Sequence, residues 1–105
     1  MKTKINVLGV DYDFEVLDER DNHMYEFESD GYCDNFHKAI KVLDIGNPTY
    51  EHDVAIHEIL HAFLYESGIE LGYGNHNEDN VNWISLQFDK IRKAVEKYEK
   101  DIEKK

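Results

Sequence analysis

The chain has 105 residues and a formal net charge of −11, from 23 acidic and 12 basic side chains. This length supports one domain, over residues 1–105, and excludes a catalytic domain joined to a separate recognition domain. The acidic balance opposes direct nucleic-acid binding, which requires a basic footprint. No apolar run approaches membrane-spanning length, the N-terminal residues lack the apolar core of a signal peptide, and Cys33 is the lone cysteine. We therefore expect a cytoplasmic protein that does not enter a membrane.

The first half of the chain predicts a small sheet. Ile5 and Val7 alternate with polar residues, and residues 10–16 alternate apolar and acidic, which is typical of a half-buried β-hairpin. Residues 18–37 are polar and carry no clear period, so a short helix and an irregular strand both remain open there. Residues 39–44 predict a third strand, and the turn formers at 45–48 end it.

Two helices are expected in the second half. Residues 53–68 contain no internal proline or glycine, are apolar around much of the circumference, and end at Gly68, a residue suited to a left-handed C-cap. After a loop, Asn77 can cap a second, amphipathic helix whose apolar residues recur at spacings of three and four. The predicted fold is α+β, with a three-stranded, mostly antiparallel sheet packed on a buried helix and a C-terminal amphipathic helix.

The sequence His57-Glu58-Ile59-Leu60-His61 lies within the first predicted helix. Histidines at i and i+4 share one helical face, so both imidazoles can reach one metal ion, and zinc is the expected ion. Glu58 adjoins that face, where its carboxylate can take a proton from an activated water and return it to a leaving amine. Burying these three groups would be costly without a compensating cation.

A catalytic zinc site usually has three protein ligands, so a third must come from elsewhere. Glu78 is the first candidate, because it lies three residues before Val81 and extends the apolar stripe of the second helix to its first turn. His76, on the preceding loop, is the alternative. Asp79 is a weaker candidate because the helical turn rotates it away from that face.

Several other residues are candidates for supporting roles. Tyr65, four residues after His61, can orient a histidine or donate to an oxyanion, although a core tyrosine is the preferred interpretation. Asn82, four residues after Glu78, can hydrogen-bond the ligating carboxylate. The remaining histidines are expected to be exposed or locally hydrogen-bonded, and are His23, His37 and His52. Cys33 is expected to be chemically inert.

The motif helix and the block Asn77-Glu78-Asp79-Asn80-Val81-Asn82-Trp83-Ile84 resemble the small HExxH metallopeptidase-like proteins encoded in bacteriophages and prophages. The likeness covers about residues 31–91 and includes Gly31-Tyr32-Cys33-Asp34. More distantly, Glu78 with Val81, Asn82 and Ser85 is similar to the Glu-x-x-Ala-Asn-x-x-Ala signature of the ImmA/IrrE metallopeptidases. This resemblance implies a minimal zincin-like, gluzincin-like domain, a host-cell cytoplasmic location, and Glu78 as the third zinc ligand.

A second family, the SprT-like proteases, has a histidine as third ligand after a loop. His76 would fill that place, but the Gly-Pro-Glu that commonly follows it in that family is absent here, and the acidic charge is unsuited to DNA-bound substrates.

Two classes of function follow. The first is a zinc-dependent peptidase, acting on a protein or peptide substrate that the strand around residues 40–43 aligns by edge pairing. The second is a non-catalytic zinc protein in which Cys33 or His76 completes the metal shell and an acidic face binds a host or phage protein. That acidic face comes from ten acids between residues 11 and 34, against the single base Arg20. It is either a solvated surface or a mimic of nucleic acid.

Overall fold

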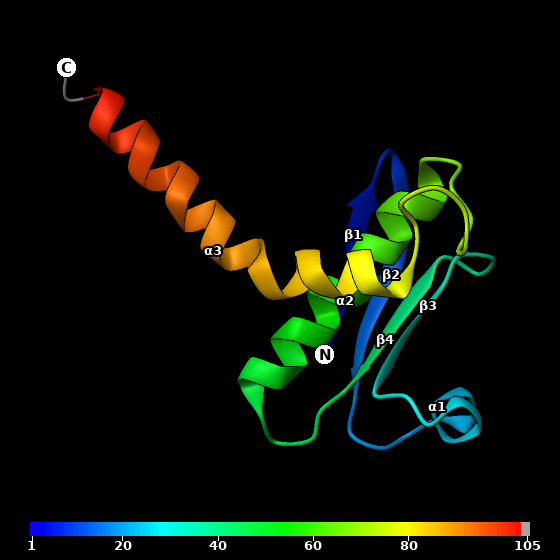
Figure 1. Cartoon of the computed structure of the whole chain (residues 1–105). Helices are drawn as coiled ribbons and strands as arrows, with labels where there is room; N and C mark the ends of the chain where they lie inside the picture. The colour runs from blue at the N-terminus through cyan, green and yellow to red at the C-terminus, as the bar shows by residue number, and fades with distance from the viewer. Residues whose placement is uncertain (104–105) are drawn as a thin grey trace.

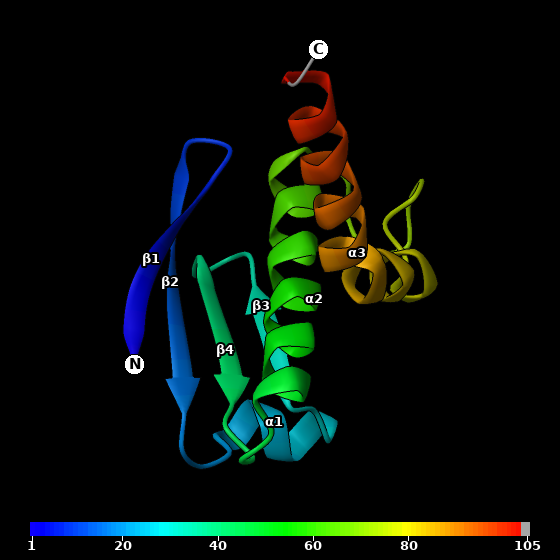
Figure 2. The same cartoon turned by 90° about the vertical axis from the view of Figure 1, so that its left-hand side faces the viewer.

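The computed structural model describes residues 1–103. The elements follow in the order β1 (Lys2–Val7), β2 (Val10–Leu17), α1 (Asn22–Phe27), β3 (Gly31–Asp34), β4 (Ala39–Leu43), α2 (Pro48–Glu66) and α3 (Glu78–Glu103). The strands form one mixed sheet in the order β1-β2-β4-β3. Helix α2 lies along one face of the sheet, and α3 lies across α2 on the side away from the sheet (Figures 1 and 2). The α+β class is confirmed, but the predicted three-stranded sheet is wrong by one strand.

The predicted hairpin is formed by β1 and β2, which pair antiparallel from Lys2 with Glu15 to Val7 with Val10. Leu8 and Gly9 connect them with φ values of 52° and 90°. Two positive φ values suit a tight hairpin turn, whose backbone twist matches that of the flanking strands. Alternation then buries Tyr12 and Phe14 on the side of α2 and leaves the acidic residues of β2 facing solvent.

The segment without a sequence assignment, residues 18–37, contains both α1 and β3. Asp21 caps α1 by accepting a hydrogen bond from the Met24 N–H at 2.9 Å, and Met24 is fully buried. Strand β3 pairs antiparallel with β4, whereas β4 pairs parallel with β2. With only four residues and one of them glycine, β3 is too short to show a period, so tertiary pairing rather than local pattern defines it.

Helix α2 starts five residues before the expected Asp53. Asn47 accepts a hydrogen bond from the Tyr50 N–H at 3.1 Å, and Pro48 occupies the first helical turn. The residues predicted to form a turn therefore initiate the helix, because proline at this position loses no helical hydrogen bond. At the other end, Gly68 has a φ of 84°, and the N–H groups of Gly68 and Ile69 donate to the carbonyls of Tyr65 and Leu64. This is the Schellman arrangement that a glycine after the last turn permits.

The core lies between the sheet and α2. Its fully or almost fully buried members come from the three strands β1, β2 and β4 and from α2, and are Val7, Tyr12, Phe14, Ile40, Val42 and Ala62. The Tyr12 hydroxyl donates to Glu66 Oε2 at 2.6 Å, and Lys38 Nζ donates to the same oxygen at 2.7 Å. These bonds tie the C-terminal end of α2 to the sheet.

The expected burial of the motif helix is only partly correct. Of the residues of α2, His61 and Ala62 are buried, while most others are half-buried. Helix α3 covers a further part of α2 but continues beyond it, and the molecule extends 54 × 33 × 25 Å. None of the helices within residues 1–103 has the length and apolar character needed to cross a membrane.

Gly31 is a point of close approach between β3 and α2. A Cβ added there would lie 2.6 Å from Val54 Cγ1 and 3.1 Å from the carbonyl oxygen of Lys41. The Gly31→Ala substitution should therefore lower the free energy of unfolding by about 1–3 kcal/mol through overpacking, as measured by urea denaturation. Val54→Ala removes the contacted methyl group, so the double variant should lose less stability than the two single losses combined. If the losses of the two single variants simply add in the double variant, the contact between position 31 and Val54 is not the cause of the destabilisation.

Candidate metal centre

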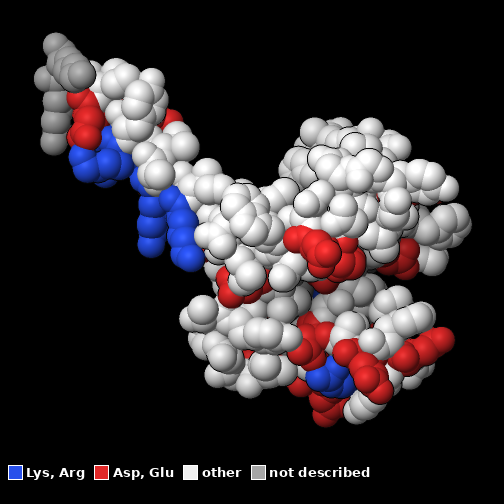
Figure 3. Space-filling view, in the orientation of Figure 1, with Lys and Arg blue, Asp and Glu red and all other residues white. Residues whose placement is uncertain are grey.

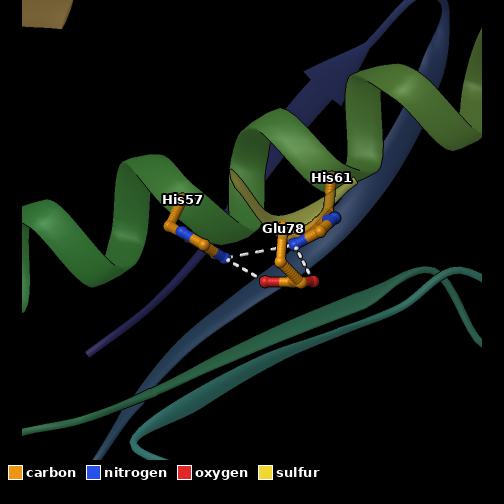
Figure 4. Close-up of side chains that lie close together, drawn as sticks. All are labelled: His57, His61 and Glu78. Carbon is orange, nitrogen blue, oxygen red and sulfur yellow. Dashed lines mark hydrogen bonds and ion pairs between the residues drawn. The ribbon is translucent and has the colours of Figure 1, made fainter. Parts of the chain in front are cut away.

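Three side chains from two helices converge beside the sheet. His57 and His61 project from the same face of α2, and Glu78 is the first residue of α3 (Figure 4). Glu78 Oε2 lies 3.0 Å from His57 Nε2, and Glu78 Oε1 lies 2.9 Å from His61 Nε2. The two Nε2 atoms are 3.2 Å apart. Among residues 1–103, these three form the cluster whose nitrogen and oxygen atoms could hold one metal ion.

The spacing of these atoms suits a small divalent cation. Two ligand atoms of a tetrahedral zinc ion, with bonds of about 2.0–2.1 Å, lie about 3.3 Å apart. The distances of 2.9, 3.0 and 3.2 Å between the ligand atoms are close to that value. Two neutral imidazoles and one carboxylate are also a donor set that binds zinc and neighbouring transition metals well. The residues therefore fit a metal centre with three protein ligands and room for water or substrate.

Local chain geometry explains how Glu78 reaches the histidines. Asn77 Oδ1 accepts a hydrogen bond from the Asn80 N–H at 2.9 Å, so Asn77 caps α3 as expected. Glu78 therefore lies in the first turn, and Val81 one turn later is fully buried. Because α3 packs on α2 and its first turns are held by the buried Val81, the carboxylate of Glu78 lies over His57 and His61. Asp79, the weaker candidate, is not part of the cluster.

His76 contacts the site from behind rather than as a third ligand. Its Nδ1 lies 2.6 Å from the carbonyl oxygen of Ile69, and its Nε2 lies 2.8 Å from His61 Nδ1. Since a carbonyl can only accept, Nδ1 of His76 carries the proton and Nε2 accepts one from His61 Nδ1. His61 is thereby held as the tautomer whose Nε2 lone pair points at Glu78 and His57. A buried hydrogen-bond partner of this kind orients a ligating histidine.

Burial sets the protonation of the inner histidine. His61 is 5% exposed, and its burial lowers its pKa; the neighbouring histidines act in the same direction, while the carboxylate of Glu78 opposes them. The imidazole is therefore neutral at neutral pH, the form in which histidine binds metals.

Glu58 lies between the histidines in sequence and borders the same hollow. Burial, followed by the negative charge of Glu78, raises the pKa of Glu58 to about 7. A carboxyl with a pKa near neutrality can both accept and return a proton at neutral pH. Burial, with a smaller effect of Glu58, raises the pKa of the Cys33 thiol to about 12, so the thiol is protonated in the metal-free protein, and Cys33 is not part of the cluster.

A groove passes along β3 and the candidate centre. It consists of two adjoining hollows, and both are lined by Ser29, Gly31, His57 and Glu58. Asn82 borders one hollow and Tyr65 the other. Asn82 makes no hydrogen bond to Glu78 among the described residues, and the Tyr65 ring packs edge-on against His76 with centroids 4.7 Å apart. Both residues therefore lie at the groove, while the expected bond from Asn82 to the carboxylate is absent.

Sequence reasoning assigned no role to Ser29, Gly31 or Tyr32, which line this groove. The signal available for Gly31 and Tyr32 was the resemblance, whose first block is Gly31-Tyr32-Cys33-Asp34, whereas no sequence signal marked Ser29. The remaining histidines are not members of the cluster, although His23 borders one of the two hollows. His37 contacts Asp34 at 2.8 Å, His52 contacts Asp89 at 2.8 Å, and His23 stacks on Tyr32.

Several acids of the segment 11–34 have structural partners. Lys4 binds Asp13 at 2.7 Å, Lys41 binds Glu15 at 2.6 Å, and Arg20 binds Asp30 at 2.5 Å. Other acidic side chains remain at the surface, where they gather on the domain in the view of Figure 3. Part of the acidic charge thus stabilises the sheet and the connection to β3.

Comparison with known proteins finds no match to this chain among family models, curated proteins or solved structures. The features of the molecule that bear on its function are therefore the geometry of the His57, His61 and Glu78 cluster and the groove that passes it.

Metal binding can be measured directly by titrating zinc into the metal-free chain with a calorimeter. We expect one site per chain, and His57→Ala, His61→Ala and Glu78→Gln should each weaken binding by more than about a hundredfold, because each removes a ligand. His52→Ala is the matched control, since His52 pairs with Asp89 at the surface. Unchanged affinity in Glu78→Gln would exclude Glu78 as a ligand.

The role of His76 gives a separate prediction. His76→Gln keeps a hydrogen-bond acceptor for His61, whereas His76→Leu removes it. His76→Leu should reduce zinc affinity by about 10–100-fold, as expected for loss of a partner of a ligating histidine, and His76→Gln should recover part of that loss. Nitrogen chemical shifts of His61 in the metal-free protein should show the proton on Nδ1. A proton on Nε2 would refute the assigned tautomer.

Proposed function

We propose that this chain is a zinc-dependent peptidase. The observation that carries the proposal is the convergence of His57, His61 and Glu78 beside Glu58 in a groove along a sheet edge. A structural cluster would need neither the half-buried carboxyl of Glu58, with its near-neutral pKa, nor an open groove. The resemblance to small HExxH metallopeptidase-like proteins agrees with this assignment.

His57, His61 and Glu78 would hold the ion, which when bound polarises a carbonyl and lowers the pKa of water towards about 7. Glu58 accepts the proton of the water that attacks the scissile carbonyl carbon. It then delivers that proton to the leaving amine nitrogen as the C–N bond breaks. His76 keeps the His61 ring in the orientation that this site needs.

The edge that can align a substrate is β3. The strand predicted for this task, at residues 40–43, is part of β4, which is paired on both sides and has no free edge. β3 is the outer strand beside the groove, and its residues Gly31, Tyr32 and Cys33 line the same hollow as Glu58. An extended peptide added to β3 would run past the candidate centre, with main-chain hydrogen bonds that do not depend on its sequence.

The ligand set supports catalysis over a purely structural metal. Structural zinc sites are closed by four protein ligands, whereas catalytic sites use three. Within residues 1–103 the cluster has three members. His76 is engaged with His61 and Ile69, and Cys33 is not part of the cluster.

Hydrolysis provides the test of the proposal. The zinc-loaded chain is incubated with a peptide library, and new termini are identified by mass spectrometry. The Glu58→Gln variant should retain zinc but cleave about 10²–10⁴-fold more slowly than the parent chain, because it loses the general base. Glu70→Gln, at an exposed position, serves as the control and should cleave like the parent chain. Equal cleavage by Glu58→Gln would refute the mechanism, and a zinc-loaded parent chain that cleaves no peptide would favour a binding protein.

A further inference from the structure

The C-terminal part of α3 leaves the domain. Going along α3 towards its C-terminal end, the last side chain that hydrogen-bonds to α2 among residues 1–103 is Asp89, which lies 2.8 Å from His52. Every residue from 90 to 103 is exposed, and this part of the helix points away from the body of the protein (Figure 1). The radius of gyration is 15.4 Å, compared with about 13 Å for a compact domain of this length. We call residues 90–103 the projecting helix.

An apolar stripe runs along the projecting helix. Its members are spaced alternately by three and four residues, the pattern of the a and d positions of a heptad repeat. They are between 42% and 62% exposed, and are Phe88, Ile91, Val95, Tyr98 and Ile102. Val81 and Ile84 continue the same spacing into the part of α3 that packs on α2. In a helix that stays exposed to solvent, a regular apolar period over several turns would add nothing to the stability of the fold.

The stripe joins an apolar hollow on α2. This hollow is lined by Phe88, where the stripe begins, and by four residues of α2, namely Ile56, Ile59, Leu60 and Phe63. Stripe and hollow together form one continuous apolar surface. Residues 90–103 continue a helix that begins on the domain, but they are exposed, so packing against a partner would add the tertiary contacts from which most helical stability in proteins comes.

The charges beside the stripe distinguish between possible helix partners. Figure 3 shows basic side chains along one side of the projecting helix and uncharged atoms along another. Between residues 90 and 103 there are five basic and four acidic side chains, so this part is nearly neutral in a chain of net charge −11. Two copies can therefore approach along it with little repulsion.

We propose that the projecting helix pairs antiparallel with the same helix of a second copy of this chain. If Val95 packs against the partner's Tyr98, Arg92 faces the partner's Glu99, and two-fold symmetry repeats this ion pair. A parallel pair in register would instead set Arg92 against Gln87 and Glu99 against Ala94, with no ion pair. The antiparallel arrangement also keeps the two acidic domains at opposite ends, and brings the partner's helix end towards the hollow at Phe88.

Sedimentation equilibrium of the full-length chain over a range of concentrations tests the pairing. The parent chain should show a monomer–dimer equilibrium. Val95→Asp should raise the dissociation constant by about a hundredfold or more, because it places an unpaired carboxylate in the interface. Val95 is exposed in the single chain, so circular dichroism and urea unfolding should show an intact domain. Lys93→Asp, on the opposite side of the helix, is the control and should leave the dimer in place.

Charge exchange tests the orientation. Arg92→Glu and Glu99→Arg should each weaken the dimer several-fold through like-charge contacts, and the double variant should restore it. A parent chain that remains monomeric at all concentrations, or a dimer insensitive to Val95→Asp, would overturn the proposal. A double variant as weak as the single variants would overturn the antiparallel arrangement. Each readout is independent of zinc and of peptide cleavage.

Discussion

The close packing of α2 against the edge of the sheet determines the rest of this structure. Gly31 of β3 lies so near α2 that a Cβ would meet Val54 at 2.6 Å, and Ala62 of α2 is buried in the core. These contacts hold one side of α2 against the sheet, so the adjoining side of the helix faces the edge strand β3. His57, Glu58 and His61 are on that side, so the chemistry of the chain is placed beside a free strand.

The candidate centre gathers groups that are unfavourable together unless a cation is present. Two imidazole nitrogens 3.2 Å apart share a carboxylate with which both are in contact. Burial keeps His61 neutral by lowering its pKa, and His76 fixes the tautomer that exposes its Nε2 lone pair. Preorganisation of this kind reduces the reordering that ligand binding would require, and is typical of metal sites supported by a second layer of hydrogen bonds.

The two ends of helix α3 have different surroundings and different roles. Its first turn is held by the Asn77 cap and the buried Val81, which is why Glu78 can be positioned accurately. Its later turns are exposed among residues 1–103, yet retain a regular apolar stripe. If two copies associate through that stripe, the metal centre at the other end of α3 is not covered by the contact. Assembly and the proposed catalysis would then be separate properties of one helix.

Local patterns in the sequence were sufficient for the hairpin, for β4, for the helical nature of the motif segment and for the Asn77 cap, since each depends on residues close together in the chain. The start of α2 was wrong because Asn47 and Pro48 favour both turns and helix N-termini. Burial of α2 was overestimated, because apolar residues around a helix do not reveal how much of it a small sheet can cover. β3 was missed because four residues carry no measurable period.

The sequence by itself determined that two histidines and a glutamate share a helix and that Glu78 begins another. Tertiary structure alone decided which partners they meet. The packing of α3 on α2 sets Glu78 over both imidazoles, and the loop before α3 turns His76 towards the opposite nitrogen of His61. The strand order makes β3, not β4, the outer strand beside the groove. These outcomes depend on contacts between residues distant in sequence, which no spacing within a single segment can encode.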